Sequence, residues 1–506
     1  MKKDKINYRI ASFLLMASLA TTTISCSDDD NNSNNTVEAP NVNFTALTNN
    51  NVIVKYNARN LTSPISTTPI TGLAGSEQIV SIDYRPATGQ LYALGSSSRL
   101  YFINEESGAA TALGTASFSP ATSGTNASLD FNPTVDRIRL VTASGQNLRL
   151  HPELGTVVAT DIAIAGNANT RIGAVAYTNS MAGASSTTLY DIDFGEDKLY
   201  IQNPPNDGGL QLVGDLTIDF EGQGDFDILA DNSQALAVTN NNSISKLYTI
   251  DLTNGKAVDV GTFGLQVISL AFKTNPVAFA TTADNLLYRF NPTSPMINSV
   301  ALAGLSSGET VVGLDFRPAT GTLYAITNQS RLLTVNTANG QLTQVGTSLT
   351  PSLSGTSFGF DFNPTVDRIR LVSDTGQNLR LHPDLGTVVF TDGNLNPGTP
   401  VVNAGAYTNN FAGSTTTALF VIDTSTDMLY LQNPPNNGTL VSVGSLGFNV
   451  ETANGFDIGG SSNAAFALFR VNGVTSVYAI NLTTGAATKG ADINIQATAM
   501  AVGLGF

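Results

Sequence analysis

Six aspartates recur in β-prone segments, and their carboxylates are the side chains best suited to do chemistry. They are Asp83, Asp130, Asp227, Asp315, Asp361 and Asp457. Because side chains alternate along a strand, Ser81, Asp83 and Arg85 share one face. If such strands line a channel, the carboxylates form an acidic ring that could bind Ca²⁺ or another hard cation. Apart from this possible Ca²⁺, we expect no cofactor. The alternative is structural: each carboxylate accepts hydrogen bonds from a neighbouring unit's backbone or pairs with Arg85, Arg317 or a similar partner.

Two further sets of polar residues could recognise a ligand. Four arginines could present guanidinium forks to a carboxylate: Arg139, Arg149, Arg370 and Arg380. Asn203 and Asn433 lie in the repeated loop QNPPN (202–206 and 432–436), beside Tyr200 and Tyr430. Tyr, Asn and Gln together can stack on and hydrogen-bond to sugars, and loops on a rigid scaffold often carry recognition. The alternatives are ordinary blade turns and strand connections.

No catalytic set is apparent. His151 and His382 are the two histidines of the chain, and each stands before a proline after a β-prone run, where a turn role is expected. Two distant histidines without cysteine partners make a poor zinc site. No G-x-S-x-G elbow precedes a helix, so a Ser-His-Asp triad is not indicated. We therefore predict no catalytic residues.

The elements that must position these residues are repeated. Residues 132–141 (NPTVDRIRLV) recur unchanged at 363–372, and GQNLRLHP at 145–152 recurs at 376–383. Both halves must therefore share one fold. Within each half, five units with a spacing of about 46 residues contain short β-prone runs separated by turn signals, which indicates four antiparallel strands per unit. Such units predict an all-β protein, a β-propeller, with a sandwich or β-solenoid as the alternatives.

The first unit lacks an opening strand, whereas the C-terminal residues 499–506 (AMAVGLGF) resemble residues 269–273, which would open the sixth unit. This predicts that the last residues pair beside the N-terminal unit and close one ring of about ten blades. The halves would be 42–272 and 273–506. The short connection 273–276 also favours one ring, because such turns normally join neighbours in a sheet. The alternative is two five-bladed propellers.

The repeated motif identifies a family. Residues 361–370 (DFNPTVDRIR), followed by 376–381 (GQNLRL), resemble the signature of a bacterial family called domain of unknown function 4394. Both halves carry the motif, so the resemblance covers nearly all of the chain after its first 41 residues. It implies no established activity and no catalytic residues.

The N-terminus reads as an export signal. Basic residues precede a short apolar run at 11–20, which is typical of a signal peptide over residues 1–25. The following Cys26, after Thr23-Ile24-Ser25, resembles a lipobox cysteine, and it is the single cysteine of the chain. An acidic, Asn-rich tether is expected over residues 26–41. Acidic residues directly after a lipid-bearing cysteine resemble a surface-export signal, which favours the outer face of the bacterial outer membrane, with the periplasm as the alternative.

Charge limits the partners. The formal charge is −15, and removal of residues 1–25, with four basic and one acidic side chain, would make it −18. An acidic chain without a basic face is not expected to bind nucleic acid. We predict a monomeric surface lipoprotein that binds a glycan or protein through its loops and contacts the membrane only through its lipid. The alternative is an extracellular hydrolase or lyase that uses the channel aspartates.

Overall fold

The computed structural model describes residues 38–124, 126–295 and 297–506. The signal peptide, Cys26 and most of the predicted tether lie outside these residues. Within them, the regular structure is β, apart from two short 3-10 helices, η1 (Pro205–Asp207) and η2 (Pro435–Asn437). No helix of the described part is long and apolar enough to cross a membrane.

Alternating apolar runs and turn residues produce ten four-stranded antiparallel sheets, as predicted, and we call each sheet a blade. Five blades belong to the first half of the chain. From the inner to the outer strand they are β4 (Ile79–Tyr84), β5 (Leu91–Gly95), β6 (Arg99–Ile103) and β7 (Ala110–Ala112); β8 (Ala127–Asn132), β9 (Arg137–Thr142), β10 (Asn147–Leu150) and β11 (Val157–Thr160); β12 (Ile172–Tyr177), β13 (Leu189–Asp193), β14 (Lys198–Gln202) and β15 (Leu210–Asp215); β16 (Gln223–Ile228), β17 (Ala235–Asn241), β18 (Ile244–Ile250) and β19 (Ala257–Thr262); and β20 (Val267–Ala271), β1 (Asn43–Thr48), β2 (Val52–Asn57) and β3 (Ser66–Pro69).

The other five blades belong to the second half. In the same order they are β24 (Val311–Arg317), β25 (Thr322–Thr327), β26 (Leu332–Val335) and β27 (Leu342–Val345); β28 (Phe358–Asn363), β29 (Arg368–Ser373), β30 (Asn378–His382) and β31 (Thr387–Thr391); β32 (Val402–Tyr407), β33 (Leu419–Asp423), β34 (Met428–Gln432) and β35 (Leu440–Ser445); β36 (Thr452–Ile458), β37 (Ala465–Val471), β38 (Val474–Ile480) and β39 (Ala487–Asp492); and β40 (Ala497–Val502), β21 (Ala278–Thr282), β22 (Leu286–Phe290) and β23 (Asn298–Ala301).

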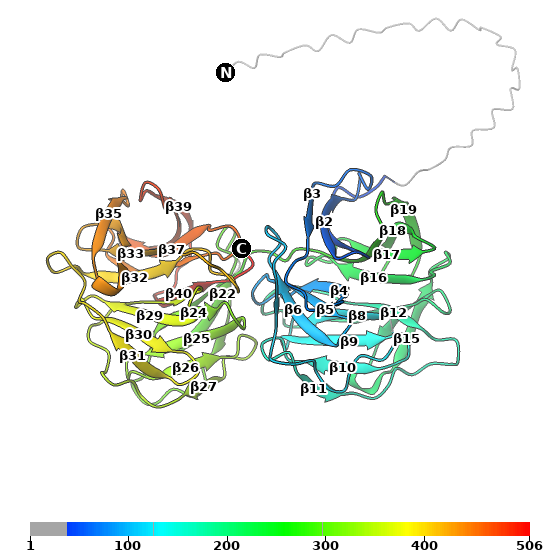
Figure 1. Cartoon of the computed structure of the whole chain (residues 1–506), viewed down its shortest axis with the longest axis horizontal. Coiled ribbons are helices and arrows are strands. Elements are labelled where there is room, and N and C mark those ends of the chain that lie inside the picture. The colour runs from blue at the N-terminus through cyan, green and yellow to red at the C-terminus, as the bar shows by residue number, and fades with distance from the viewer. Residues whose placement is uncertain (1–37, 125, 296) are drawn as a thin grey trace, which may run out of the picture. The chain divides into compact units, whose positions relative to one another are not determined.

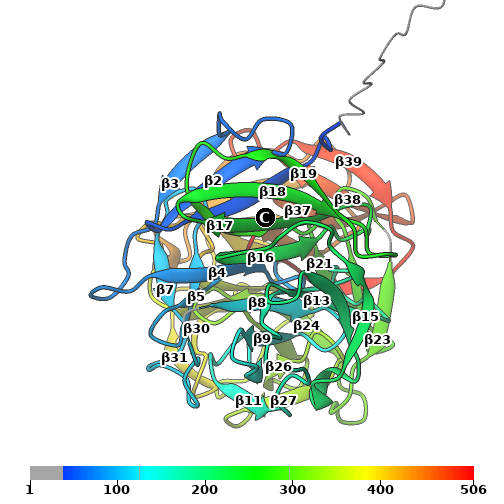
Figure 2. The ribbon, with the colours of Figure 1, turned by 90° about the vertical axis from the view of Figure 1, so that its right-hand side faces the viewer.

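The blades form two five-bladed rings and not the single ring that we favoured (Figure 1). In the first ring, inner strands β4, β8, β12, β16 and β20 contact one another in sequence, and β20 returns to β4. Strands β24, β28, β32, β36 and β40 close the second ring in the same way. In Figure 2, the inner strands β4, β8 and β16 lie nearer the middle of the first ring than the outer strands β7, β11 and β15.

Ring closure differs from the prediction in its partners. Strand β20, not the C-terminus, pairs with β1, through Thr45 and Ala271. The C-terminal strand β40 pairs with β21, through Ala278 and Val502. Each half therefore supplies the strand that closes its own ring. The short connection from β20 to β21 joins strands of different sheets, because these two strands close and open separate rings.

The hydrophobic core lies between neighbouring blades. Tyr92 of β5 packs against Phe131 of β8 with ring centroids 4.9 Å apart. In the second ring, Tyr324 of β25 and Phe362 of β28 are 5.2 Å apart. Residues 39–506 form one compact unit. The packing fixes the inner strands, which position the candidate site residues.

Candidate functional site

The predicted channel aspartates do come together, in two triads. Carboxylate oxygens of Asp83, Asp130 and Asp227 lie within 4.8 Å of one another, and those of the second triad are equally close. The second triad comprises Asp315, Asp361 and Asp457. All six side chains are buried. Strand alternation therefore places them as predicted.

Their partners favour the structural alternative. Asp83 Oδ1 accepts the amide of Tyr84 at 2.7 Å, and its Oδ2 accepts the amide of Phe131, on the next inner strand, at 2.9 Å. Asp130 accepts the amide of Tyr177, again on the following blade, at 3.2 Å. Each carboxylate thus joins consecutive inner strands.

The second ring repeats the pattern. Asp315 accepts the amides of Phe316 and Phe362, both at 2.7 Å. Asp457 bonds the amides of Ile458 and Val502, and the latter belongs to the closing strand β40. The carboxylates therefore stabilise ring closure.

Burial sets the ionisation of these groups. Burial, followed by repulsion from Asp227, raises the pKa of Asp83 well above its usual range. Burial also raises the pKa of Asp227 and of Asp457 to about 7. A hard cation requires ionised carboxylates and six or more oxygen ligands. The triads offer buried carboxylate oxygens, but their protons and backbone donors compete with a cation.

The first ring carries a second polar layer, which the sequence reading missed. Asp225, two residues before Asp227, accepts hydrogen bonds from the hydroxyls of Ser81, Ser128 and Ser269. Burial raises the pKa of Asp225 to about 7, although these hydroxyls donate to it. The equivalent residues of the second ring are small and apolar: Gly313, Gly359, Gly455 and Ala499. A comparison of the halves residue by residue could have found this difference.

Arg85 organises a buried charge cluster at the other end of β4. Its side chain is fully buried, Nε donates to Asp136 Oδ1 at 2.9 Å, and Nη2 bonds Asp136 and Glu153. Nη1 donates to the carbonyl of Gly321 in the second ring at 2.9 Å. Burial alone would raise the pKa of Asp136, but the guanidinium holds it below its usual value. The Asp136 carboxylate thus pairs with Arg85.

His151 lies beside this cluster in a turn, as expected. Its Nδ1 accepts the amide of Glu153 at 3.2 Å. Burial, with Arg137 and Arg85 nearby, lowers its pKa to about 4, so the imidazole is neutral at pH 7. His382 makes the same bond to the amide of Asp384. Both histidines thus have a turn role in the structure.

The predicted recognition arginines are bound within the protein. Arg139 donates to Asp161 at 2.7 Å and to Asn206 of the QNPPN loop at 2.8 Å, and Arg149 forms a two-bond fork with Asp161. Arg370 and Arg380 bind Asp392 in the same manner. In the two QNPPN loops, the arginines bond the side chains of Asn206 and Asn436, the last residue of each loop. The predicted Asn203 and Asn433 do not make this contact. These contacts favour a structural role.

Asp191 on β13 is a buried acid whose carboxylate oxygens have no hydrogen-bond partner among the described residues. Burial raises its pKa well above the usual range. In the second ring the equivalent residue is Val421, which is also fully buried. The site therefore suits an apolar side chain.

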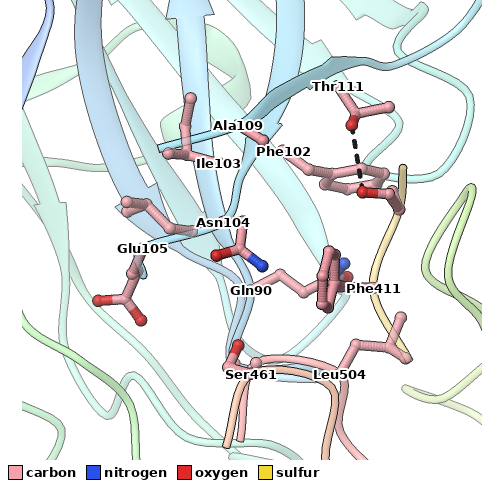
Figure 3. Close-up of a pocket in the computed structure, with 14 residues that line it drawn as sticks. Gln90, Phe102, Ile103, Asn104, Glu105, Ala109, Thr111, Phe411, Ser461 and Leu504 are labelled. Atoms are coloured by element: carbon pink, nitrogen blue, oxygen red, sulfur yellow. Dashed lines mark hydrogen bonds between the residues drawn. The ribbon is translucent and has the colours of Figure 1, made fainter. Parts of the chain in front are cut away.

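Two cavities differ greatly in size. One, lined by residues of both rings that include Gln90 and Phe411, has a volume of about 30 Å³ (Figure 3). Thr111 Oγ1 donates to the carbonyl of Ala412 across it. It has room for a water molecule and no larger ligand.

The second cavity lies where the inner strands β8, β12 and β16 begin, and we call it the strand-start cavity. Its volume is about 360 Å³. Its lining comprises Asn126, Ala143, Arg171, Gly173, Phe194, Glu221, Gly222 and Asn241. None of these residues was predicted as a site residue, because they lie at separate strand ends and turns and form no motif in the sequence.

The fold and its channel define a tandem β-propeller. A family model described as a domain of unknown function (DUF4394) matches residues 52–271 and again residues 286–503. The chain therefore belongs to this family and carries two copies of its domain. A search of curated proteins gave no match. One similar solved structure is described as "Structure of Dos1 propeller"; the similarity covers 63% of this chain and 82% of that chain, with 10% sequence identity and a TM-score of 0.26.

Proposed function

We propose that the protein is a non-catalytic binding module that recognises its ligand through loops of the first ring. The observation that carries this proposal is the strand-start cavity, which has the volume of a small-ligand site and polar side chains on its walls. The channel carboxylates, in contrast, are used by backbone amides of neighbouring blades. A rigid scaffold with a ligand-sized cavity in its loops is typical of recognition.

The proposed location is the outer face of the bacterial outer membrane, with a lipid on Cys26. The support is the sequence alone: a signal-like run, a single cysteine in a lipobox-like position and acidic residues after it. Protease treatment of intact cells tests the location. We expect digestion of the protein at the surface, whereas complete protection would contradict it. A Cys26→Ala variant should lose membrane association.

The alternative is a hydrolase or lyase that uses channel carboxylates. Asp361 favours this alternative. Burial raises the pKa of its carboxyl well above the usual range, and the neighbouring Asp315 and Asp457 raise it further, as is typical of a general acid. A glycan array combined with a broad hydrolase screen separates the two functions. We expect binding without turnover. Turnover that is abolished by Asp361→Asn in a folded variant would overturn the binding proposal.

A further inference from the structure

We propose that the strand-start cavity binds one neutral sugar ring, either a free sugar or the terminal residue of a glycan. This inference rests on the proposed binding function and specifies its ligand class. A volume of about 360 Å³ suits a ligand of this size. The case depends on an apolar platform, on polar groups around it and on the balance of charge.

Phe194 provides the apolar platform. It follows β13, is half-buried and packs edge-to-face on Phe220, with centroids 5.5 Å apart. A Cβ at Gly173 or at Gly224 would lie 2.7 Å from the Phe194 ring, so only glycine permits the ring to lie between these two inner strands. An aromatic ring in the wall of a wet cavity can pack against the apolar C–H face of a sugar.

The second ring shows that the platform is a specific feature of the first. At the equivalent positions Asn403 replaces Gly173 and Thr424 replaces Phe194. Asn403 Oδ1 accepts the amide of Thr424 at 3.2 Å and its hydroxyl at 2.5 Å. The asparagine therefore occupies the space that glycine leaves for the aromatic ring, and the same blade folds without the platform.

Polar side chains line the same cavity as Phe194, and hydrogen bonds hold them in place. Glu221 Oε2 accepts a hydrogen bond from the side-chain Nδ2 of Asn241, and Asn126 Nδ2 donates to the carbonyl of Gly222 at 3.1 Å. Arg171 Nη1 donates to two carbonyls at 3.3 Å, and the side chain is exposed at the cavity. Carboxylate, amide and guanidinium groups supply the donors and acceptors that sugar hydroxyls require.

Charge favours a neutral sugar. Arg171 and Glu221 contribute opposite charges to the cavity wall, and the whole chain has a formal charge of −15. A sulfated or polyuronate ligand would be repelled by the protein and would meet one guanidinium in this cavity. A neutral ring can instead use both charged groups as hydrogen-bond partners.

Saturation-transfer NMR on the full chain tests the inference, with glucose, galactose, mannose and N-acetylglucosamine as neutral probes and glucuronate as an acidic one. Glycosides of the best sugar distinguish a free sugar from a terminal residue. We expect transfer to at least one neutral sugar and none to glucuronate.

The double variant Gly173→Asn with Phe194→Thr copies the second ring, so it should fold and lose at least about tenfold in affinity. Glu221→Gln should weaken binding by about tenfold because it removes a charged acceptor.

Glu451→Gln is the matched control, since Glu451 is the equivalent residue of the second ring, and it should bind as tightly as the unaltered chain. If no neutral sugar binds, or if binding survives in the folded double variant, the inference is wrong. If no sugar binds and no turnover is seen, the proposed sugar ligand is wrong, but the proposed binding function still stands. Turnover in the hydrolase screen would instead reject the proposed binding function.

Discussion

The two rings share the hydrogen bonds that join their inner strands, but they differ in the side chains beside those bonds and in the residues at the start of the inner strands. In both rings, aspartates on the inner strands accept amides of the next blade. In the first ring a polar layer around Asp225 lies beside this framework, whereas glycines and an alanine stand there in the second. The shared residues are those that hold the blades together, and the differing residues are where a specific function is to be sought.

The charge cluster around Arg85 should reveal the largest difference between the rings. Arg85→Ala leaves the buried Asp136 and the half-buried Glu153 without their cation, so we expect a loss of about 3–5 kcal/mol in the free energy of unfolding. Arg317→Ala affects a copy in which the Asp384 side chain is 59% exposed, and we expect a loss of about 1 kcal/mol.

Urea unfolding of both variants measures this difference. Arg470→Ala is the control, because the Arg470–Glu451 pair is exposed and its loss should have little effect. Equal losses for Arg85→Ala and Arg317→Ala would show that burial of the cluster does not determine its contribution.

A substitution copied from the second ring should stabilise the first. Asp191→Val replaces a buried, unpartnered carboxyl by the residue found at position 421, and we expect a gain of about 2–3 kcal/mol. Because the folded pKa of Asp191 is raised, its carboxyl costs least below the unfolded value of about 3.9, and the cost grows as the pH rises. The gain in Tm should therefore be larger at pH 8 than at pH 5, and a loss of stability would contradict this account.

The polar layer of the first ring should give an effect that depends on pH. The pKa of Asp225 is about 7 in the folded chain and about 3.9 when unfolded, so its protonated form stabilises the fold at low pH and this contribution is lost as the pH rises to 7. Asp225→Asn removes this dependence. The free energy of unfolding of the Asp225→Asn variant, relative to that of the unaltered chain, should rise by up to about 1.4 kcal/mol per pH unit between pH 5 and 7. Parallel pH profiles of Tm would show that Asp225 does not titrate in this range.

Calcium should have the smallest effect, in either ring. The triad carboxylates already accept backbone amides and have raised pKa values, so we expect no heat and no change in Tm when millimolar Ca²⁺ is added to metal-stripped protein at pH 7. Calorimetry measures the heat. If Ca²⁺ raises the Tm and the Asp361→Asn variant loses this rise, the second ring holds a cation site, contrary to our expectation.

The repeat pattern sufficed to predict the blades. The copies of NPTVDRIRLV and the turn signals between β-prone runs gave ten four-stranded sheets, and strand alternation placed Asp83 and its equivalents together. The number of rings was not predictable in this way. The runs 269–273 and 499–506 are alike, so either could have paired with the N-terminal unit, and only the packing of five inner strands around a channel decides between them.

The candidate cavity was hidden for a different reason. Gly173 and Phe194 are not adjacent in the sequence, and neither belongs to a recognisable motif. They meet because β12 and β13 are paired neighbours. The signal that could have found them is a joint difference between the halves, since both positions change together to Asn403 and Thr424.

The closing strand β20 determines how the molecule would carry a mechanical load. The chain enters the first ring through β1, which lies between β20 and β2 and is hydrogen-bonded to both. Tension applied from the N-terminal side therefore acts on a strand held by two ladders of hydrogen bonds and not on an edge strand. If the proposed anchor on Cys26 exists, a pull on it would reach the first ring through a strand that is hydrogen-bonded along both edges.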